Sequence, residues 1–281
     1  MTIIVKDSYT LMLGDCLERM REIPDGSVDM VLADLPYGTT QCRWDIVIPL
    51  EALWEHYWRV LKPTGVVVLF AAQPFTSKVV CSAIDHFKYE WVWRKPKGTG
   101  HLNAKKQPLR DKEDILVFYR KQCTYNPQLT PGTPYKNKAG KDHAATSSQT
   151  DSYGSYTNFR NPNEGFRYPK QVLEFGVVER DTLHPTQKPV PILEYLVKTY
   201  TNEGDLVLDN TMGSGSTGVA ALQTGRCFVG VEKEPAYFEV AAERLSLAQS
   251  GGTTSDSTQG PACPDDSEPS AHGGLKNLRG K

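Results

Sequence analysis

The sequence predicts an α/β protein built on a doubly wound, mostly parallel sheet. Two patterns predict this class: apolar runs that end in an acidic residue, and a glycine-rich turn that joins one such run to a helical stretch. Residues 28–33 form the first run and lead into Asp34, and residues 206–208 form the second and lead into Asp209. Open α/β sheets bind their ligands outside the carboxyl ends of their strands. Both acids are therefore expected at a ligand site.

The other elements follow from hydrophobic periodicity and from stop signals along the chain. Residues 9–23 contain a short strand, a turn and a helix. The Lys-Pro-Thr-Gly stretch at 62–65 ends the expected helix at residues 49–61. The other expected strands cover residues 65–71, 89–93 and 114–119, and the other expected helices cover residues 49–61, 74–86, 189–200 and 235–248.

The tetrapeptide Asp34, Leu35, Pro36 and Tyr37 can hold the exocyclic amine of a flat base. Asp34 and the Leu35 carbonyl accept the two N–H groups of the amine, Pro36 stiffens the turn, and Tyr37 stacks on the ring. Four residues alone also fit an ordinary exit from a strand into a loop, because short motifs match by chance. The tetrapeptide becomes informative only beside the second run.

The second run enters a glycine-rich turn, residues 213–218, and then a helix. Glycine permits a tight turn and a close approach of the backbone to a ligand, and the free N–H groups at a helix start suit a carboxylate or a phosphate. The next strand, residues 227–232, ends in Glu232, whose carboxylate can accept both hydroxyls of a ribose. This is a half-site for a nucleoside cofactor.

The turn is not specific for one cofactor, because Gly-Ser-Gly-Ser-Thr-Gly also matches the dinucleotide fingerprint. A nicotinamide-dependent oxidoreductase therefore stays open at this point. A phosphate loop of the NTPase type is disfavoured, since no Gly-Lys-Ser/Thr closes the turn.

Taken together, the motifs resemble those of the β-class amino-group DNA methyltransferases, which use S-adenosylmethionine. The resemblance covers roughly residues 9–125 and 180–247, and it places the catalytic tetrapeptide before the cofactor turn, in the circularly permuted order of the β class. It implies a Rossmann-like methyltransferase sheet with a target-recognition insertion. The matching pieces are residues 34–38, His184-Pro185-Thr186-Gln187-Lys188-Pro189, residues 209–222 and residues 229–232.

The resemblance also implies roles for individual residues. Asp34, Leu35, Pro36 and Tyr37 become catalytic, Asp15 contacts the adenine of the cofactor, and Lys188 helps to hold its methionine end. Leu35 stands where the family most often has proline, and Asn210-Thr211 stands where it commonly has Pro-Phe. The full expected cofactor set is Asp15, Cys16, Lys188, Asp209, Thr211, Gly213, Gly215, Ser216, Thr217 and Glu232.

The expected activity is site-specific methylation of DNA, as in restriction-modification systems. In the family, Asp at the first tetrapeptide position usually goes with the N6 amine of adenine, so Asp34 favours adenine, flipped out of the duplex because its amine is inaccessible in the stack. No nucleophilic cysteine is expected, since no Pro-Cys turn of the carbon-5 type occurs in the fold. The alternatives are an N4-cytosine methyltransferase of the same fold, a nicotinamide-dependent oxidoreductase and a non-catalytic DNA-binding module.

Charge is strongly segregated along the chain, although the formal net charge is only −1. Twelve Lys or Arg residues and three acids lie between residues 94 and 141, which leaves the rest of the chain acidic. Aromatic residues interleave with this basic run or follow it. A local basic surface is the electrostatic footprint of a phosphate backbone. We therefore expect duplex DNA as the partner, bound by Arg94, Lys95, Lys105, Lys106 and Arg110.

The six cysteines are scattered and form no C-x-x-C pair, so we expect reduced thiols and no metal site. No apolar run is long enough to span a membrane, and the first six residues lack a signal-peptide pattern. The protein is accordingly expected in the cytoplasm, where enzymes of this class are often homodimers.

Composition and resemblance together suggest how the chain is organised. Residues 122–180 lose periodicity and gain Gly, Pro, Asn, Ser and Tyr, and residues beyond about 250 are rich in Gly, Ser, Asp and Pro. We expect a catalytic half at 1–121, a target-recognition insertion at 122–180, a cofactor-binding half of the same domain at 181–248 and a disordered tail at 249–281.

Overall fold

The structure is a computed structural model that describes residues 2–38, 45–134, 146–150, 154–158, 165–178 and 187–251. The expected tail beyond residue 251 lies outside the described residues. So does the first part of one predicted motif, His184-Pro185-Thr186, whereas Gln187 and Lys188 are described.

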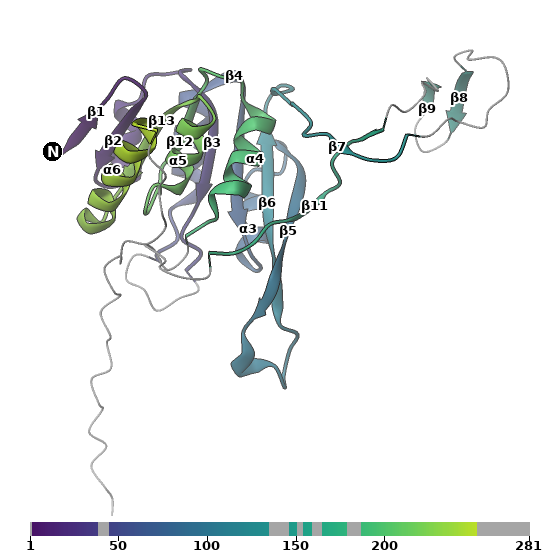
Figure 1. Ribbon diagram of the computed structural model, residues 1–281, viewed down its shortest axis with the longest axis horizontal. Helices are drawn as coiled ribbons and strands as arrows, with labels where there is room; N and C mark the ends of the chain where they lie inside the picture. Colours follow the sequence, from purple (N-terminus) through teal and green to yellow (C-terminus); the bar gives the residue numbers. More distant parts are fainter. Residues whose placement is uncertain are drawn as a thin grey trace, which may run out of the picture.

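Nine of the described strands form one mixed sheet in the order β1-β2-β13-β12-β3-β4-β6-β5-β11 (Figure 1). The five strands from β2 to β4 are parallel to one another, β11 is parallel to β5, and the pairs β1/β2, β4/β6 and β5/β6 are antiparallel. The strands are β1 (Ile3–Val5), β2 (Tyr9–Leu13), β3 (Val28–Asp34), β4 (Leu61–Ala71), β5 (Phe87–Thr99), β6 (Arg110–Tyr119), β11 (Val172–Glu174), β12 (Leu206–Asp209) and β13 (Cys227–Glu232).

Helices cover both faces of the sheet, so that the central strands are buried on both sides, as parallel strands must be. In β3, Met30 and Leu32 face one apolar core, and Val31 and Ala33 face the other. The first core also holds α4 (Val190–Tyr200), α5 (Ser216–Gln223) and α6 (Pro235–Gln249); the second holds α1 (Cys16–Arg19), the 3₁₀ turn η1 (Met20–Glu22), α2 (Leu50–Val60) and α3 (Phe75–Ser82).

The neighbouring strands β3 and β12 mark the point where the direction of winding reverses. From β3 the chain passes through α2 to β4 on one side, and from β12 it passes through α5 to β13 on the other side. The two connections run over opposite faces of the sheet, and this leaves a crevice at the carboxyl ends of β3 and β12. In open α/β sheets this switch point is the ligand site. It brings Asp34 and Asp209 to the same edge, as the sequence predicts.

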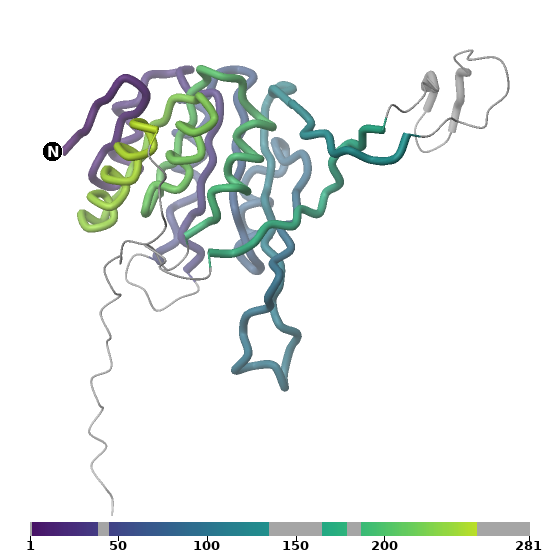
Figure 2. The backbone as a smooth tube through the Cα atoms, viewed as in Figure 1, coloured from purple at the N-terminus to yellow at the C-terminus, as the bar shows by residue number. Residues whose placement is uncertain are grey.

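The strands β5 and β6 extend beyond the sheet as a two-stranded arm, defined here as residues 95–110, with the 3₁₀ turn η2 (His101–Asn103) at its tip (Figures 1 and 2). The strand β5 is antiparallel to β6, which is antiparallel to β4, so β5 ends at the same edge of the sheet as β3. Both strands are longer than the expected 89–93 and 114–119. The outer parts of β5 and β6 are polar, so backbone hydrogen bonds, and not apolar side-chain contacts, hold these parts together.

The segment expected to be a loop-rich insertion contains short strands. Its strand β11 pairs with β5 and forms the edge of the main sheet. Two separate pairs occur in the same segment: β7 (Thr130–Pro131) with β10 (Phe166–Arg167), and β8 (Thr146–Thr150) with β9 (Gly154–Asn158). Such short pairs carry little apolar periodicity, which is why the sequence did not reveal them.

Candidate active site

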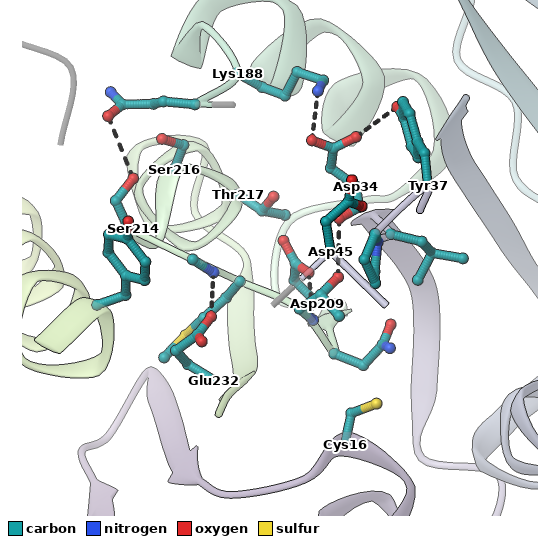
Figure 3. Close-up of a pocket in the computed structure, with 18 of the residues that line it drawn as sticks. Cys16, Asp34, Tyr37, Asp45, Lys188, Asp209, Ser214, Ser216, Thr217 and Glu232 are labelled. Atoms are coloured by element: carbon teal, nitrogen blue, oxygen red, sulfur yellow. Dashed lines mark hydrogen bonds and ion pairs between the residues drawn. The ribbon is translucent and has the colours of Figure 1, made fainter. Parts of the chain in front are cut away.

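A cavity of about 660 Å³ opens at the switch point (Figure 3). This volume lies within the range of clefts that hold small molecules and cofactors. Its wall includes the exits of β2 and β3, the turn after β12 with the end of β13, the root of the arm and the segment before α4 that carries Lys188. Of the predicted catalytic and cofactor residues, all except Gly215 line it.

We call the part of the cavity around the tetrapeptide, where the sequence predicts a base, the base side, and Asp34 lies at its centre. The Tyr37 hydroxyl donates a hydrogen bond to Oδ1 of Asp34 at 2.7 Å, and the Lys188 ammonium donates to Oδ2 at 2.5 Å. Burial raises the pKa of Asp34 above its usual range, and the charge of Lys188 is the strongest opposing influence. Both oxygens of the carboxylate therefore have partners, and both partners are side chains.

The other members of the tetrapeptide shape the same side. The side chain of Leu35 is buried in the core on the α2 side of the sheet, which explains why an apolar residue is accepted where the family has proline. The Tyr37 ring stacks on Phe75 with centroids 5.1 Å apart and an interplanar angle of 22°. After Gly38, Asp45 accepts the Gly38 N–H at 2.8 Å.

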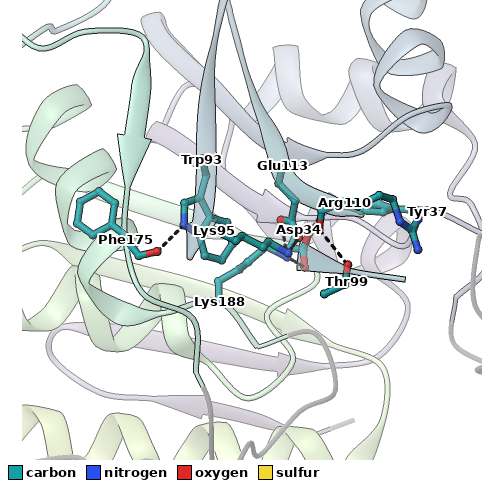
Figure 4. A network of polar contacts seen from close by, with 9 residues as sticks. All are labelled: Asp34, Tyr37, Trp93, Lys95, Thr99, Arg110, Glu113, Phe175 and Lys188. Atoms are coloured by element: carbon teal, nitrogen blue, oxygen red, sulfur yellow. Dashed lines mark hydrogen bonds and ion pairs between the residues drawn. The ribbon is translucent and has the colours of Figure 1, made fainter. Parts of the chain in front are cut away.

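A chain of four alternating charges connects Asp34 with the arm (Figure 4). Lys188 lies between two carboxylates, since its Nζ is 2.5 Å from Asp34 Oδ2 and 3.4 Å from Glu113 Oε2. The other oxygen of Glu113, Oε1, accepts a hydrogen bond from Lys95. We call Lys95, Glu113, Lys188 and Asp34 the charge quartet.

The charges of the quartet sustain one another in a buried place. Burial alone would lower the pKa of Lys188, but the carboxylates of Asp34 and Glu113 outweigh it and raise that pKa. Burial likewise opposes ionisation of Glu113, but Lys188 and Lys95 outweigh it and lower the pKa of Glu113. The raised pKa of Lys188 and the lowered pKa of Glu113 both indicate that these two side chains are ionised.

Two members of the quartet differ from the expectations drawn from the sequence. Lys95, expected at a DNA phosphate, points inward, bonds Glu113 and lies 4.9 Å from the Trp93 ring centroid. Glu113 was not predicted at all. Side chains alternate along a strand, so Lys95 shares a face with buried Trp93, and Glu113 shares one with buried Ile115. That alternation is the signal that could have placed both residues.

We call the part of the cavity around the glycine-rich turn, where the sequence predicts a cofactor, the cofactor side; there, backbone N–H groups hold the Glu232 side chain. Its Oε2 accepts the Gly213 N–H at 2.8 Å, and its Oε1 accepts the N–H groups of Lys233 and Glu234 at 2.9 and 2.8 Å. Burial raises the pKa of Glu232, and these three hydrogen bonds oppose the rise. An ionised carboxylate has about four acceptor positions, so acceptor capacity remains for a ligand hydroxyl.

Asp209 lies below the glycine turn and is fully buried. Its Oδ1 accepts the Thr211 N–H at 3.0 Å, and the Thr217 hydroxyl also bonds it. Burial, and less strongly the charges of Asp34 and Glu232, raise the pKa of Asp209 to about 7. Thr211, which replaces the aromatic residue common in the family, donates its hydroxyl to the Asp34 carbonyl at 3.1 Å and so ties the two sides together.

The first two glycines of the predicted turn, Gly213 and Gly215, have different functions in the fold. Both have positive φ, +51° at Gly213 and +79° at Gly215, where other residues are strained. Gly213 lines the cavity, whereas Gly215 does not. A Cβ on Gly215 would lie 2.8 Å from Leu245 and 3.0 Å from Ala241, so glycine is needed here for packing against α6. Ser216 and Thr217, in the first turn of α5, do line the cavity.

Asp15 and Cys16 line the cavity from the end of β2. Asp15 caps α1 by accepting the Leu17 N–H at 3.0 Å, a structural role in addition to the expected contact with the cofactor. Burial raises the pKa of Cys16 to about 11. A protonated thiol is a poor nucleophile, so Cys16 is not activated for attack.

The remaining predicted DNA contacts lie on the arm or at its base. Lys105, Lys106 and Arg110 are exposed, and Arg94 is exposed but pairs with Glu174 at 2.5 Å. Lys97 and Thr99, near the base of the arm, line the cavity. The arm thus carries positive charge outward from the cavity wall.

Neither a membrane-spanning helix nor a metal cluster is present in the described part of the chain. Across those ranges, no helix is long and apolar enough to cross a membrane. Within the same residues, no three His, Cys, Asp or Glu side chains are arranged to hold a metal ion.

The doubly wound sheet with a glycine-rich turn at its switch point is the Rossmann-like fold found in solved DNA methyltransferases. Within this class, the chain belongs to the N6/N4 DNA methylase family, because the model of that family, described as DNA methylase, matches residues 28–243. The expectation of an amino-group DNA methyltransferase is thereby confirmed.

Curated relatives cover most of the chain. It is 28% identical over 277 residues to the type II methyltransferase M.HpaI of Haemophilus parainfluenzae, covering 91% of this chain and 80% of the relative. It is 27% identical over 256 residues to the DNA adenine methyltransferase YhdJ of Escherichia coli K12, covering 86% and 84%. Among solved structures, M1.HpyAVI in complex with SAM has the same fold, with a TM-score of 0.58 and 24% identity over 84% of this chain and 100% of that one.

Proposed function

We propose that this protein transfers a methyl group from S-adenosylmethionine to the N6 amine of a specific adenine in duplex DNA. One observation carries the proposal: the carboxylates of Asp34 and Glu232, one suited to an amine and one to a ribose, open into a single cavity at the switch point. Family membership and a relative named as a DNA adenine methyltransferase support it.

The residues of the cavity fit S-adenosylmethionine, which supplies an electrophilic methyl group when bound. Three backbone N–H donors already occupy Glu232, and of about four acceptor positions on its carboxylate one remains for a ribose hydroxyl. Asp34, Asp209 and Glu232 give the cavity negative charge, which complements a cofactor that carries a sulfonium and an ammonium group. Asp15, Cys16, Ser216 and Thr217 complete the proposed wall.

On the base side, positioning is the main contribution that the protein can make. The amine of adenine is a weak nucleophile because its lone pair is delocalised into the ring. Asp34 and the Leu35 carbonyl would accept its two N–H groups and turn the lone pair towards the methyl group. The negative charge of Asp34 would stabilise the positive charge that develops on nitrogen. Tyr37, already packed on Phe75, would stack on the flipped base.

The DNA surface is proposed to lie on the arm and on the segment that follows it. Exposed Lys105, Lys106 and Arg110 would contact phosphates, which position the duplex without reading its sequence. Base-specific contacts would come from the target-recognition segment, residues 122–180, between the catalytic part at 1–121 and the cofactor part at 181–248. This order of parts would be the circular permutation of the β class.

The proposal is tested by incubating the purified protein with unmethylated DNA and methyl-labelled S-adenosylmethionine, followed by chromatography of the nucleosides. We expect the label in N6-methyladenine. Label only in N4-methylcytosine would keep the mechanism and overturn the choice of base. Absence of label, together with binding of a nicotinamide dinucleotide in calorimetry, would favour an oxidoreductase. Absence of label despite tight binding of S-adenosylmethionine and DNA would favour a non-catalytic DNA-binding module.

A further inference from the structure

The acceptor that the target amine needs is already engaged in the structure. Under the proposed function, on which this inference rests, the amine must donate a hydrogen bond to the Asp34 carboxylate. One oxygen of that carboxylate accepts from the Tyr37 hydroxyl, and the other accepts from the Lys188 ammonium at 2.5 Å. An ammonium and an exocyclic amine present the same kind of donor. Lys188 therefore lies where the target amine is expected.

Lys188 cannot remain on Asp34 during methyl transfer without opposing it. Positive charge develops on the attacking nitrogen, and an ammonium beside it would repel that charge strongly in a buried site. The same ammonium would also neutralise the carboxylate that should stabilise the developing charge. The side chains of Lys188 and Asp34 are only 9% and 20% exposed, so solvent screens this interaction little.

A second acceptor for Lys188 lies within reach. Oε2 of Glu113 is buried and lies 3.4 Å from Lys188 Nζ, at ion-pair distance but without a well-formed hydrogen bond from any described residue. Buried carboxylate oxygens are normally hydrogen-bonded, so an unsatisfied one beside an ammonium calls for an explanation. A shift of well under about 1 Å would bring the ammonium into hydrogen-bond range of this oxygen. Lys95 occupies only the other oxygen, Oε1.

We propose that Lys188 holds the place of the target amine on Asp34 in the absence of the base, and passes to Glu113 Oε2 when the base enters. Glu113 is then a positioning residue for the reaction, and Lys95 holds Glu113 in place. The transfer moves one positive charge between two buried carboxylates. No charge has to be exposed to water or newly buried, and Asp34 is left free to accept the amine.

The first test compares Glu113→Gln with Glu113→Asp in the full chain, measuring methyl transfer to unmethylated DNA and the Kd of S-adenosylmethionine. In the Gln variant Lys188 keeps its charged partner Asp34 and loses the competing one. We expect kcat to fall about 10- to 100-fold, the size expected for removing a charged hydrogen bond, with cofactor Kd unchanged. Glu113→Asp keeps the charge and should recover part of kcat. Glu194→Gln, in a surface ion pair with Lys198, is the matched control and should behave as the unaltered protein.

The second test repeats Glu113→Gln in a Lys188→Met background. In this background no ammonium has to leave Asp34, so Glu113→Gln should lower kcat by less than about threefold. If the two residues acted independently, Glu113→Gln would lower kcat by the same factor in both backgrounds. Equal costs would overturn the inference. If the Lys188→Met protein does not bind cofactor, the first test decides: an Asp variant no better than the Gln variant, or a Gln variant with unchanged kcat, overturns it. Absence of any transfer by the unaltered protein would instead overturn the proposed function.

Discussion

The two sides of the cavity hold their carboxylates in different ways. On the cofactor side, Glu232 accepts three backbone N–H groups, and Asp209 accepts one more from Thr211. On the base side, the hydrogen bonds that the described residues donate to the Asp34 carboxylate come from side chains, the Tyr37 hydroxyl and the Lys188 ammonium. Backbone groups at the ends of strands are fixed by the sheet, whereas a lysine has four rotatable bonds. The cofactor side is therefore formed in advance, and the base side can rearrange.

The largest effect is expected from a substitution that impairs the base side alone. Asp34→Ala removes the acceptor for the amine and the charge that stabilises the transition state, so methyl transfer should fall by about 10³-fold or more. The Kd of S-adenosylmethionine, measured by calorimetry, should change by less than about threefold, because backbone groups form that side. Asp25→Asn, at an exposed ion pair with Arg59, is the control. Activity near that of the control would refute the catalytic assignment of Asp34.

The next effect breaks the cofactor side alone. Glu232→Gln turns one acceptor into a donor that faces backbone N–H groups, so the Kd of S-adenosylmethionine should rise about 10- to 100-fold. The value of kcat at saturating cofactor should stay close to that of Glu239→Gln, a change on the exposed part of α6. A loss of kcat with an unchanged Kd would mean that the two sides are not separate.

The third prediction concerns DNA binding by the arm, which begins at the base side of the cavity. The double change Lys105→Glu and Lys106→Glu should weaken DNA binding and reduce the slope of log K against log salt by about 0.9 for each phosphate that the variant no longer neutralises. Cofactor Kd should not change. The double variant Lys6→Glu and Lys78→Glu changes the net charge equally at exposed positions outside the arm. Equal salt slopes in the two double variants would place the DNA surface elsewhere.

The smallest effect concerns the pH dependence of the cofactor side. Burial raises the pKa of Asp209 to about 7, so its side chain is neutral below pH 7 and charged above it. The charged form attracts a cationic cofactor, and affinity should rise about three- to tenfold between pH 6 and pH 8. Asp209→Asn should abolish this rise, which calorimetry at the two pH values can measure.

The same pKa fixes the sign of a stability effect. An unfolded Asp titrates near about pH 4, so the empty fold binds a proton that the unfolded chain has released between about pH 4 and 7. The contribution of Asp209 to stability therefore declines as the pH rises through that window. Urea titrations of Asp209→Asn should lack this decline, and an unchanged pH profile would contradict the assignment.

The acids at the strand ends were predictable because each depends on a short, local pattern. Asp34, Asp209 and Glu232 each follow an apolar run, and parallel strands bring their carboxyl ends to one edge. The helices over residues 49–61 and 189–200 are confirmed by α2 and α4. Their apolar faces and their proline or glycine boundaries lie within the same few residues.

The charge quartet was not predictable in the same way. Lys95 and Glu113 occur among other charged residues, and such stretches usually form a solvated face. Their inward direction depends on the alternation of β5 and β6 and on burial by the rest of the fold, which no local pattern states. Likewise, Gly215 matches a ligand-binding fingerprint, although the neighbours that require glycine there come from α6, more than twenty residues later.

The junction between arm and sheet bears on how such an enzyme can diversify. The pairing of β5 with β6 is regular from Tyr89 to Arg94, which lies opposite Lys112, then shifts before it resumes at Thr99 and Arg110. Pro96, which cannot donate to a ladder, and Gly98, packed against Leu109, lie in the shifted stretch. The register of the outer arm is thus independent of the register that places Glu113. We expect that the tip beyond Thr99 and Arg110 can be lengthened, shortened or exchanged without moving Lys95 or Glu113, so that the reach of the arm changes while the chemistry stays constant.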